Sequence, residues 1–206
     1  MKLILASQSP YRAELLGKLQ LAFSQHPSHI DEYCIAGESP KDRALRLSEA
    51  KARAVADQLA ERPIDNEQSL IIGSDQVAAL GTTILNKPGG FEQAYQQLAH
   101  SQGQIVQFYT GCCVLNAASG ASYCSVDEIT VKFRTLSEPE ITRYLQIEQP
   151  YDCAGSFKAE GLGISLFEYI HCDDPNALVG LPLISLCKLL RQHNFDPLAN
   201  TEISEG

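Results

Sequence analysis

The sequence predicts an α/β fold built on one mixed, elongated sheet that is flanked by helices. In the first half of the 206-residue chain, short apolar runs typical of buried strands alternate with amphipathic helical patterns. In the second half, two long strand patterns follow one another around a turn, which indicates a hairpin. A hairpin within an otherwise alternating order makes the sheet mixed rather than wholly parallel.

The N-terminal segment predicts a strand, a polar loop and a helix. Residues 2–6 are an apolar run of buried-strand type, and residues 7–9 form the loop. Ser9 is a good N-cap, and Pro10 lies where the first helical residue belongs. We expect the helix to run over about residues 11–20.

A second helix has equally clear boundaries. Ser39 and Asp42 form an S-x-x-D capping box, and Pro40 suits the first turn between them. The apolar positions then continue at helical spacing, and the pattern ends near Ala60.

The later elements follow from the same signals. We expect a strand at 69–73, a hairpin over 77–85, a helix at 90–100, long strands at 105–115 and 123–133, a helix opened by a capping box at Ser137, a strand at 164–170 and a helix at 183–192. No linker divides the chain, so we expect one domain over residues 1–197, followed by a flexible acidic tail at 198–206.

Composition excludes several classes of partner. The chain has 16 Lys and Arg against 25 Asp and Glu, a formal net charge of −9, so it lacks the broad basic face that binds a nucleic-acid backbone. The apolar run near the N-terminus is too short for a signal peptide, and no apolar stretch approaches the length of a membrane span. We therefore expect a cytoplasmic protein with neither a nucleic-acid nor a membrane partner.

The seven cysteines carry no obvious chemistry. No C-x-x-C pair occurs, which disfavours a structural zinc site and a disulfide framework. The cysteines fit a reduced cytosol, and we interpret Cys112 and Cys113 as small buried residues of a strand.

The first loop and helix form a candidate anion site. Free backbone N–H groups at a helix N-terminus attract anions, and Ser7 and Ser9 lie at this one. Arg12 lies in the first helical turn, where its charge opposes the helix dipole, and an anionic ligand would relieve that conflict. A capped helix with a solvated arginine explains the segment equally well, so both readings stay open here.

Asp75 is a candidate catalytic or metal-binding carboxylate. It closes an apolar strand pattern, and a carboxylate at the C-terminal end of a strand lies at the mouth of an α/β sheet. Such a group could bind a divalent cation or orient water, or it could only form a turn. Lys51, Lys87 and the pair Asp31–Glu32 are uninformative when each is taken singly.

As an ordered set, these residues resemble the Maf-like nucleotide pyrophosphatases. The resemblance opens with LILASQSPYRAELL at residues 3–16 and extends to about residue 192. Matching segments follow in order: DE at 31–32, EAKA at 49–52, IGSD at 72–75, NKP at 86–88, TVKF at 130–133 and VGLP at 179–182. Agreement at so many ordered positions is not expected by chance.

The resemblance implies a Maf/ITPase-like fold with two lobes around a central cleft, often as a homodimer. It also implies hydrolysis of a nucleoside triphosphate between the α- and β-phosphates with a divalent cation, for which Mg²⁺ or Mn²⁺ suits oxygen ligands. Asp75 matches the catalytic carboxylate, and Glu32 would support the metal or the water, so both are expected metal ligands. The expected phosphate-binding residues are Ser7, Arg12, Lys51 and Lys87.

Three positions bear on the choice of base: Tyr11, Gln76 and Glu160. They resemble the subgroup that removes modified nucleotides by hydrolysing 7-methyl-GTP to 7-methyl-GMP and pyrophosphate. An aromatic face suits a cationic 7-methylguanine ring, and the Glu160 carboxylate can accept hydrogen bonds from the guanine N1–H and amine. The sequence departs from the subgroup at Tyr11, where Trp is frequent.

Two other functions stay open at this point. One is a pyrophosphatase for UTP and dTTP, and the other is a non-catalytic nucleotide-binding regulator of septum formation.

Overall fold

The structure, a computed structural model, describes residues 1–60 and 69–200. Its strands are β1 (Lys2–Leu5), β2 (Phe23–Gln25), β3 (Ser69–Leu80), β4 (Thr83–Leu85), β5 (Ile105–Asn116), β6 (Ser122–Phe133) and β7 (Phe167–His171). The α-helices are α1 (Pro10–Gly17), α2 (Pro40–Ala60), α3 (Phe91–Ser101), α4 (Glu138–Glu148), α5 (Asn176–Val179), α6 (Leu183–Gln192) and α7 (Pro197–Asn200). Two 3-10 helices are η1 (Ala154–Ser156) and η2 (Leu162–Leu166).

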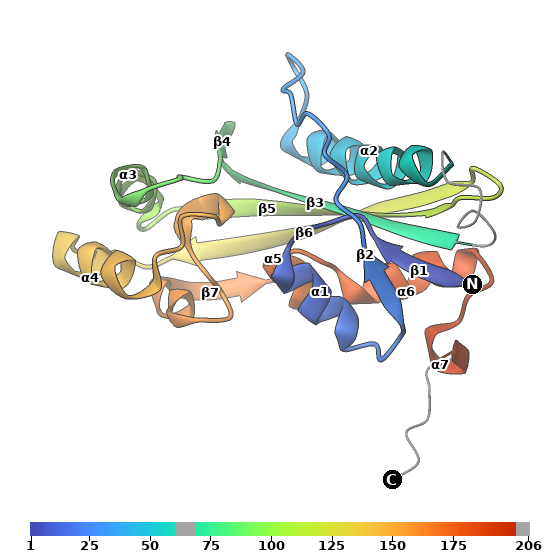
Figure 1. The fold of residues 1–206 in the computed structure, drawn as a ribbon. Coiled ribbons are helices and arrows are strands. Elements are labelled where there is room, and N and C mark those ends of the chain that lie inside the picture. Colours follow the sequence, from blue (N-terminus) through green and yellow to red (C-terminus); the bar gives the residue numbers. More distant parts are fainter. Residues whose placement is uncertain (61–68, 201–206) are drawn as a thin grey trace, which may run out of the picture.

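All seven strands belong to one sheet, which runs the length of an elongated molecule (Figure 1). The order is β2-β1-β3-β5-β6-β7, and β4 pairs with β3 off this path. β1 pairs in parallel with β2 and β3, whereas the other pairs are antiparallel. The predicted mixed α/β sheet is therefore confirmed.

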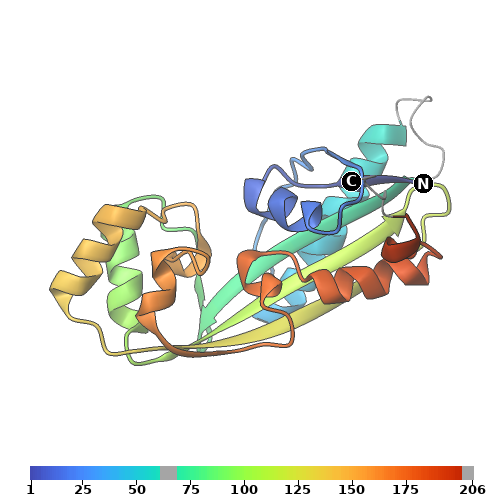
Figure 2. The same ribbon diagram turned by 90° about the horizontal axis from the view of Figure 1, so that it is seen from below.

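The long strands β3, β5 and β6 connect two lobes (Figure 2). In the first lobe, α2 covers one face of the sheet over Ile71, and α1 and α6 cover the other over Ile72. In the second lobe, α3, α4 and the 3-10 helices pack on a separate core that includes Ala78. β3 passes from one lobe to the other between Ile72 and Ala78, so polar residues at its midpoint lie where the lobes meet.

The prediction that Asp75 closes a strand is wrong. Residues 69–80 form one continuous strand, in which Asp75 lies opposite Gly111 of β5. β5 pairs with β3 on both sides of this position, so the polar residues stay within the ladder instead of turning away. Asp75 does lie past the end of its parallel neighbour, because Leu5, the last residue of β1, pairs with Ile72.

The helices with clear capping signals form as predicted. The Ser9 hydroxyl caps α1 by accepting from the N–H of Arg12 at 3.4 Å, and the Ser39 hydroxyl accepts from the N–H of Asp42 at 3.1 Å. α1 ends at Gly17, earlier than expected, since a turn follows in which Gln20 adopts a φ of 54°.

Three short elements differ from the prediction. The expected strand at 164–170 begins as the 3-10 helix η2, and only Phe167–His171 pairs with β6. β2 and α5 were not predicted, because three- and four-residue segments show no measurable periodicity. The expected flexible tail begins as α7 (Pro197–Asn200), and residues 201–206 lie outside the described part.

One pair of cysteines is bridged, although the sequence disfavours a disulfide framework. Cys113 and Cys124 lie directly opposite each other on β5 and β6, with Cα atoms 4.0 Å apart, and form a disulfide. The strand register creates this proximity, and spacing along the sequence does not reveal it. Cys112 and Cys113 are fully buried strand residues, as predicted.

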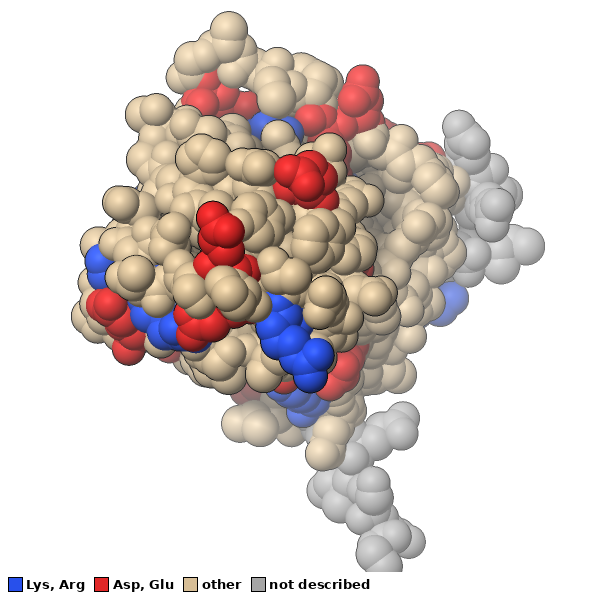
Figure 3. Space-filling model, turned by 90° about the vertical axis from the view of Figure 1, so that its left-hand side faces the viewer, with Lys and Arg blue, Asp and Glu red and all other residues tan. Residues whose placement is uncertain are grey.

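The surface shows how charge is distributed. On the face in Figure 3, Lys and Arg side chains lie singly or in small groups beside acidic ones, without a broad basic area. No helix in residues 1–60 or 69–200 is both long and apolar enough to cross a membrane.

Candidate active site

A cleft of about 720 Å³ lies between the two lobes. One wall is formed by α1, α2 and the loop at residues 27–32, and the other by residues 152–160 of the second lobe. All nine residues singled out from the sequence line this cleft: Ser7, Tyr11, Arg12, Glu32, Lys51, Asp75, Gln76, Lys87 and Glu160. The fold thus brings together side chains that lie far apart in the sequence.

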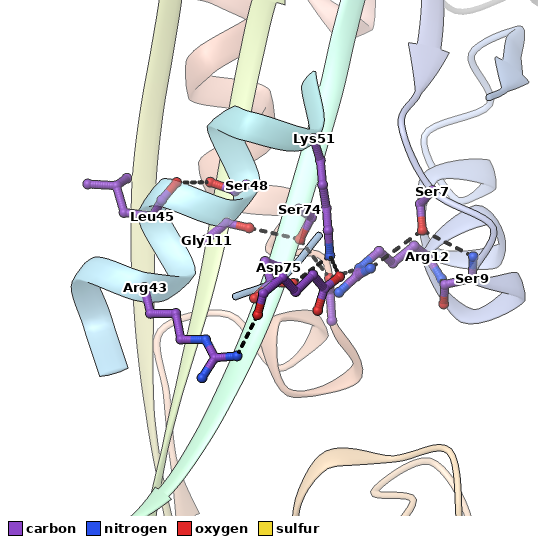
Figure 4. A network of polar contacts seen from close by, with 12 residues as sticks. Ser7, Ser9, Arg12, Arg43, Leu45, Ser48, Lys51, Ser74, Asp75 and Gly111 are labelled. Carbon is purple, nitrogen blue, oxygen red and sulfur yellow. Dashed lines mark hydrogen bonds and ion pairs between the residues drawn. The ribbon is translucent and has the colours of Figure 1, made fainter. Parts of the chain in front are cut away.

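The centre of the cleft is a lysine shared by two carboxylates. Lys51 Nζ lies 2.6 Å from Asp75 Oδ1 and 2.7 Å from Glu32 Oε1. Figure 4 shows Lys51 descending from α2 to meet Asp75 on β3, while Arg12 approaches from the side of α1. Lys51 and Asp75 are only 8% and 5% exposed, whereas half of the Glu32 side chain is exposed. One cation therefore holds two carboxylates of different solvation.

Two glycines bring α2 close enough to the sheet for this contact. A Cβ atom at Gly73 of β3 would overlap the carbonyl oxygen of Ser48, and one at Gly111 of β5 would overlap that of Ala44. Only a residue without a side chain allows the helix backbone to lie directly on the strands. This close approach lets Lys51 reach Asp75.

We predict that Gly73→Ala both destabilises the protein and lowers its turnover. The added methyl would displace the α2 backbone, and overpacking of this kind costs about 1–3 kcal/mol. Thermal unfolding measures the first effect, and release of pyrophosphate, the reaction that the family resemblance implies, measures the second. The matched control is Gly17→Ala at the end of α1, where a Cβ meets nothing within 4 Å. Unchanged unfolding and turnover in Gly73→Ala would contradict the proposed role of close packing.

The two carboxylates have pKa values shifted in opposite directions. Burial raises the pKa of Asp75 above that of an ordinary aspartate, and the negative charge of Glu32 adds to this, against the opposing effect of Lys51 and Arg12. Partial burial would also raise the pKa of Glu32, but Lys51, Lys87 and Arg12 lower it below the usual range. Such divergence suits two roles: Asp75 can take up a proton, and Glu32 stays ionised.

The N-terminal end of α1 presents donors to the cleft. Arg12 Nε donates to the carbonyl of Gly180 at 2.8 Å, and Nη1 lies 3.4 Å from Ser7 Oγ. The Ser74 hydroxyl also lies 2.9 Å from the Gly180 carbonyl, so this carbonyl ties the guanidinium to β3. The Ser9 N–H donates to Ser7 Oγ at 3.1 Å. Helix N–H groups, hydroxyls and a guanidinium together suit a phosphate group.

Lys87 contributes from the second side of the cleft. It follows β4, is exposed, and lies near enough to Glu32 to lower the pKa of that carboxyl. It is therefore an exposed cation of the cleft rather than part of the buried centre.

The three expected base-reading residues lie towards the second lobe. Tyr11 faces Asp152 and Lys158 across the cleft; burial raises the pKa of its hydroxyl, and the charge of Asp152 raises it further. Glu160 is exposed, and it forms no ion pair with any residue in the described parts of the chain. Gln76 Nε2 lies 3.0 Å from the carbonyl oxygens of residues 177 and 178, so it also supports α5.

Asp75 and Glu32 have the donor chemistry of a divalent-cation site that phosphate oxygens would complete. Across residues 1–60 and 69–200, no three His, Cys, Asp or Glu side chains converge to hold an ion by themselves. Asp75 and Glu32 nevertheless already share one cationic group, the ammonium of Lys51. Mg²⁺ is commonly bound by one or two carboxylates together with substrate phosphates, which this pair can provide for.

Two further charged residues line the cleft that the sequence did not indicate. Asp152 stands beside Tyr11, in a loop whose position depends on the packing of the second lobe. Arg43 lies on α2, eight residues before Lys51, a spacing that places both on one face of a helix. That periodicity was available from the sequence and could have identified Arg43.

Comparison with known proteins gives consistent matches over most of the chain. The family described as Maf-like protein matches residues 2–193. A 7-methyl-GTP pyrophosphatase of Nitrosococcus oceani is 51% identical over 95% of both chains, and one of Alcanivorax borkumensis is 50% identical over 91% of this chain and 92% of its own. One of Idiomarina loihiensis is 47% identical over 95% of this chain and 96% of its own.

One solved structure also aligns with the chain. The Staphylococcus aureus Ham1 protein matches 98% of this chain and 94% of its own, at 12% identity and a TM-score of 0.42. A likeness this distant says nothing about function.

Proposed function

This chain belongs to the Maf-like family, and from that premise we propose that it hydrolyses 7-methyl-GTP to 7-methyl-GMP and pyrophosphate. The observation that carries the proposal is the contact of Lys51 with both Asp75 and Glu32 at the centre of the cleft. Relatives that are 46–51% identical bear the name 7-methyl-GTP pyrophosphatase.

The residues of the cleft suit phosphoanhydride hydrolysis. The raised pKa of Asp75 makes its carboxylate a better general base than an ordinary aspartate, because a carboxylate of higher pKa takes up a proton from water more readily. We propose that the phosphates are held by Ser7, Arg12 and the N-terminal end of α1. Lys87 adds an exposed cation to the cleft. Negative charge accumulates on the departing pyrophosphate, and fixed cations stabilise it.

We propose that Asp75 and Glu32 also hold a divalent cation, Mg²⁺ or Mn²⁺. Once bound, such an ion would neutralise phosphate charge and lower the pKa of a bound water. Lys51 would then neutralise the remaining negative charge of the pair and keep both carboxylates aligned.

The negative charges in the part of the cleft near Tyr11 favour a nucleobase that carries a positive charge. Tyr11 offers an aromatic face, and the carboxylates of Asp152 and Glu160 line the same region. A 7-methylguanine ring carries a positive charge that both an aromatic ring and carboxylates attract. Uracil and thymine carry neither the charge nor the exocyclic amine, so a carboxylate is less suited to them.

Pyrophosphate release from a panel of nucleotides tests the proposal. The panel contains 7-methyl-GTP, GTP, UTP, dTTP and ITP, each with Mg²⁺ or Mn²⁺ and with an EDTA control. Metal-dependent release that favours 7-methyl-GTP is expected. Release that favours UTP or dTTP would keep the reaction and overturn the choice of base, and no release at all would favour a nucleotide-binding regulator.

Glu160→Gln is expected to reduce the preference for 7-methyl-GTP over UTP by about tenfold or more. The amide keeps the size of the side chain but loses the negative charge and one acceptor, and a lost charge-assisted hydrogen bond costs about 1.5–3 kcal/mol. The ratio of kcat/KM values for the two nucleotides measures this effect. Glu168→Gln, an exposed change on β7, is the control. An unchanged ratio in Glu160→Gln would remove Glu160 as the base reader.

We also propose a cytoplasmic homodimer, as the family resemblance implies. Light scattering during size-exclusion chromatography tests the oligomeric state, because a monomer mass of 22.5 kDa would contradict it.

A further inference from the structure

We propose that Arg43 and Arg46 of α2 are positioning residues, which fix the loop that carries Glu32 and hold its carboxylate beside Lys51. The inference rests on the proposed function in one respect, the role of Glu32 in the reaction. It adds that the helix bearing Lys51 also sets the position of Glu32.

The loop in question has little else to fix it. Residues 26–38 contain no helix or strand, and the side chains of residues 31–35 are all exposed. None of its residues belongs to the three hydrophobic clusters of the described structure. In Figure 1 this segment projects beyond α2 before the chain enters the helix. Its position therefore depends on polar contacts.

Arg46 binds the C-terminal half of this loop. Its guanidinium donates to both carboxylate oxygens of Glu38, at 2.5 and 2.7 Å, and to the carbonyl of Tyr33 at 3.1 Å. The guanidinium carbon also lies 5.1 Å from the centre of the Tyr33 ring. The Glu38 side chain is only 9% exposed, and Arg46 lowers the pKa of its carboxyl below the usual range. A two-pronged contact of this kind fixes orientation as well as distance.

Arg43 binds Glu32 directly. Its Nη2 donates to the carbonyl of Glu32 at 3.2 Å, and its Nη1 contacts Cys34 Sγ at 3.0 Å. Arg43 also lines the cleft, yet its Nε is buried and has no hydrogen-bond partner among the described residues. The main chain of Glu32 is thus attached to α2 while its side chain reaches Lys51 on the same helix.

The contacts of Arg43 and Arg46 fix the position of Glu32, but they involve none of the residues Ser7, Arg12 and Lys87. These three residues, which are proposed to hold the phosphates, lie on other elements, so at saturating Mg²⁺ loss of the arginine contacts should leave nucleotide affinity nearly unchanged. A carboxylate displaced by about 1 Å can nevertheless cost up to about 100-fold in rate. We therefore expect loss of the arginine contacts to lower kcat and not to raise KM.

The test compares Arg43→Met and Arg46→Met with Arg53→Met. Arg53 lies on the same helix and makes an exposed ion pair with Glu49, so it is the matched control. Each of the first two variants is expected to lower kcat by about tenfold with KM within about twofold, while the control matches the wild type. Hydrogen exchange of residues 30–38, measured without nucleotide or metal, is expected to accelerate only in the first two. Glu38→Gln weakens the ion pair with Arg46 from its acidic side and should reproduce the Arg46→Met result.

A double variant decides whether Arg43 acts through Glu32. In a Glu32→Gln background, Arg43→Met is expected to cause no additional loss of kcat, since residues that act through the same interaction have non-additive effects. Additive losses, or a raised KM with an unchanged kcat, would overturn the inference and make Arg43 a direct contact of the substrate. Full turnover in Glu32→Gln alone would instead refute the proposed role of Glu32. Unchanged hydrogen exchange in Arg43→Met and Arg46→Met would refute the positioning itself.

Discussion

Asp75→Asn is expected to lower turnover by about 10³-fold or more while the chain stays folded. The amide keeps the shape of the carboxylate, but it cannot accept a proton from water and is a weak metal ligand. Lys51 keeps Glu32 as a partner at 2.7 Å, so the substitution does not leave a buried cation without a counter-charge. Pyrophosphate release measures the loss, with Asp57→Asn, an exposed change on α2, as the control.

The same substitution should not destabilise the protein at neutral pH. Burial raises the pKa of Asp75 in the folded state, so the folded protein binds this proton more tightly than the unfolded chain does. The unfolding free energy contributed by Asp75 is therefore largest below the unfolded pKa of about 3.9 and falls as the pH rises through the folded value. Asn removes that loss, and we expect an equal or higher Tm at pH 7. Retained turnover, or a lower Tm than the Asp57→Asn control, would contradict this account.

Local signals in the sequence predicted most of the helices. Ser9, the pair Ser39 and Asp42, and the capping box at Ser137 each satisfy N–H groups within one turn, so their effect does not depend on distant packing. The continuity of β3 could not be predicted in this way. It depends on pairing with β5 along both lobes, and the same long-range register brings Cys113 to Cys124.

The sequence identified residues that line the cleft, but part of the local structure expected around them was wrong. Taken singly, Arg12 and Asp75 left simple structural explanations open, and the expected place of Asp75 at a strand end was wrong. The family resemblance selected the nine positions, and all of them line the cleft. Arg43 was missed although its helical spacing to Lys51 on α2 could have identified it, whereas the position of Asp152 across the cleft arises only from folded segments.

Lys51→Met is expected to lower kcat/KM by about 10²-fold and to move the acidic limb of its pH profile to higher pH. Lys51 lowers the pKa of both Asp75 and Glu32, so its removal raises both. More of the enzyme is then protonated, and inactive, at a given acidic pH. Lys87→Met is the comparison, since the exposed Lys87 acts on Glu32 from a distance. An unchanged limb in Lys51→Met would show that neither carboxyl controls the acidic side of the profile.

Lys51→Met should therefore lower the stability of the protein, whereas Asp75→Asn should not. Loss of Lys51 leaves a buried carboxylate, Asp75, facing Glu32 without a cation between them, which we expect to cost roughly 2–3 kcal/mol once the exposure of Glu32 is discounted. A divalent cation that binds both carboxylates would supply the missing charge. Mg²⁺ should consequently raise the Tm of Lys51→Met more than that of the wild type, and it should leave Asp75→Asn almost unchanged. An equal shift in all three proteins would place the metal elsewhere.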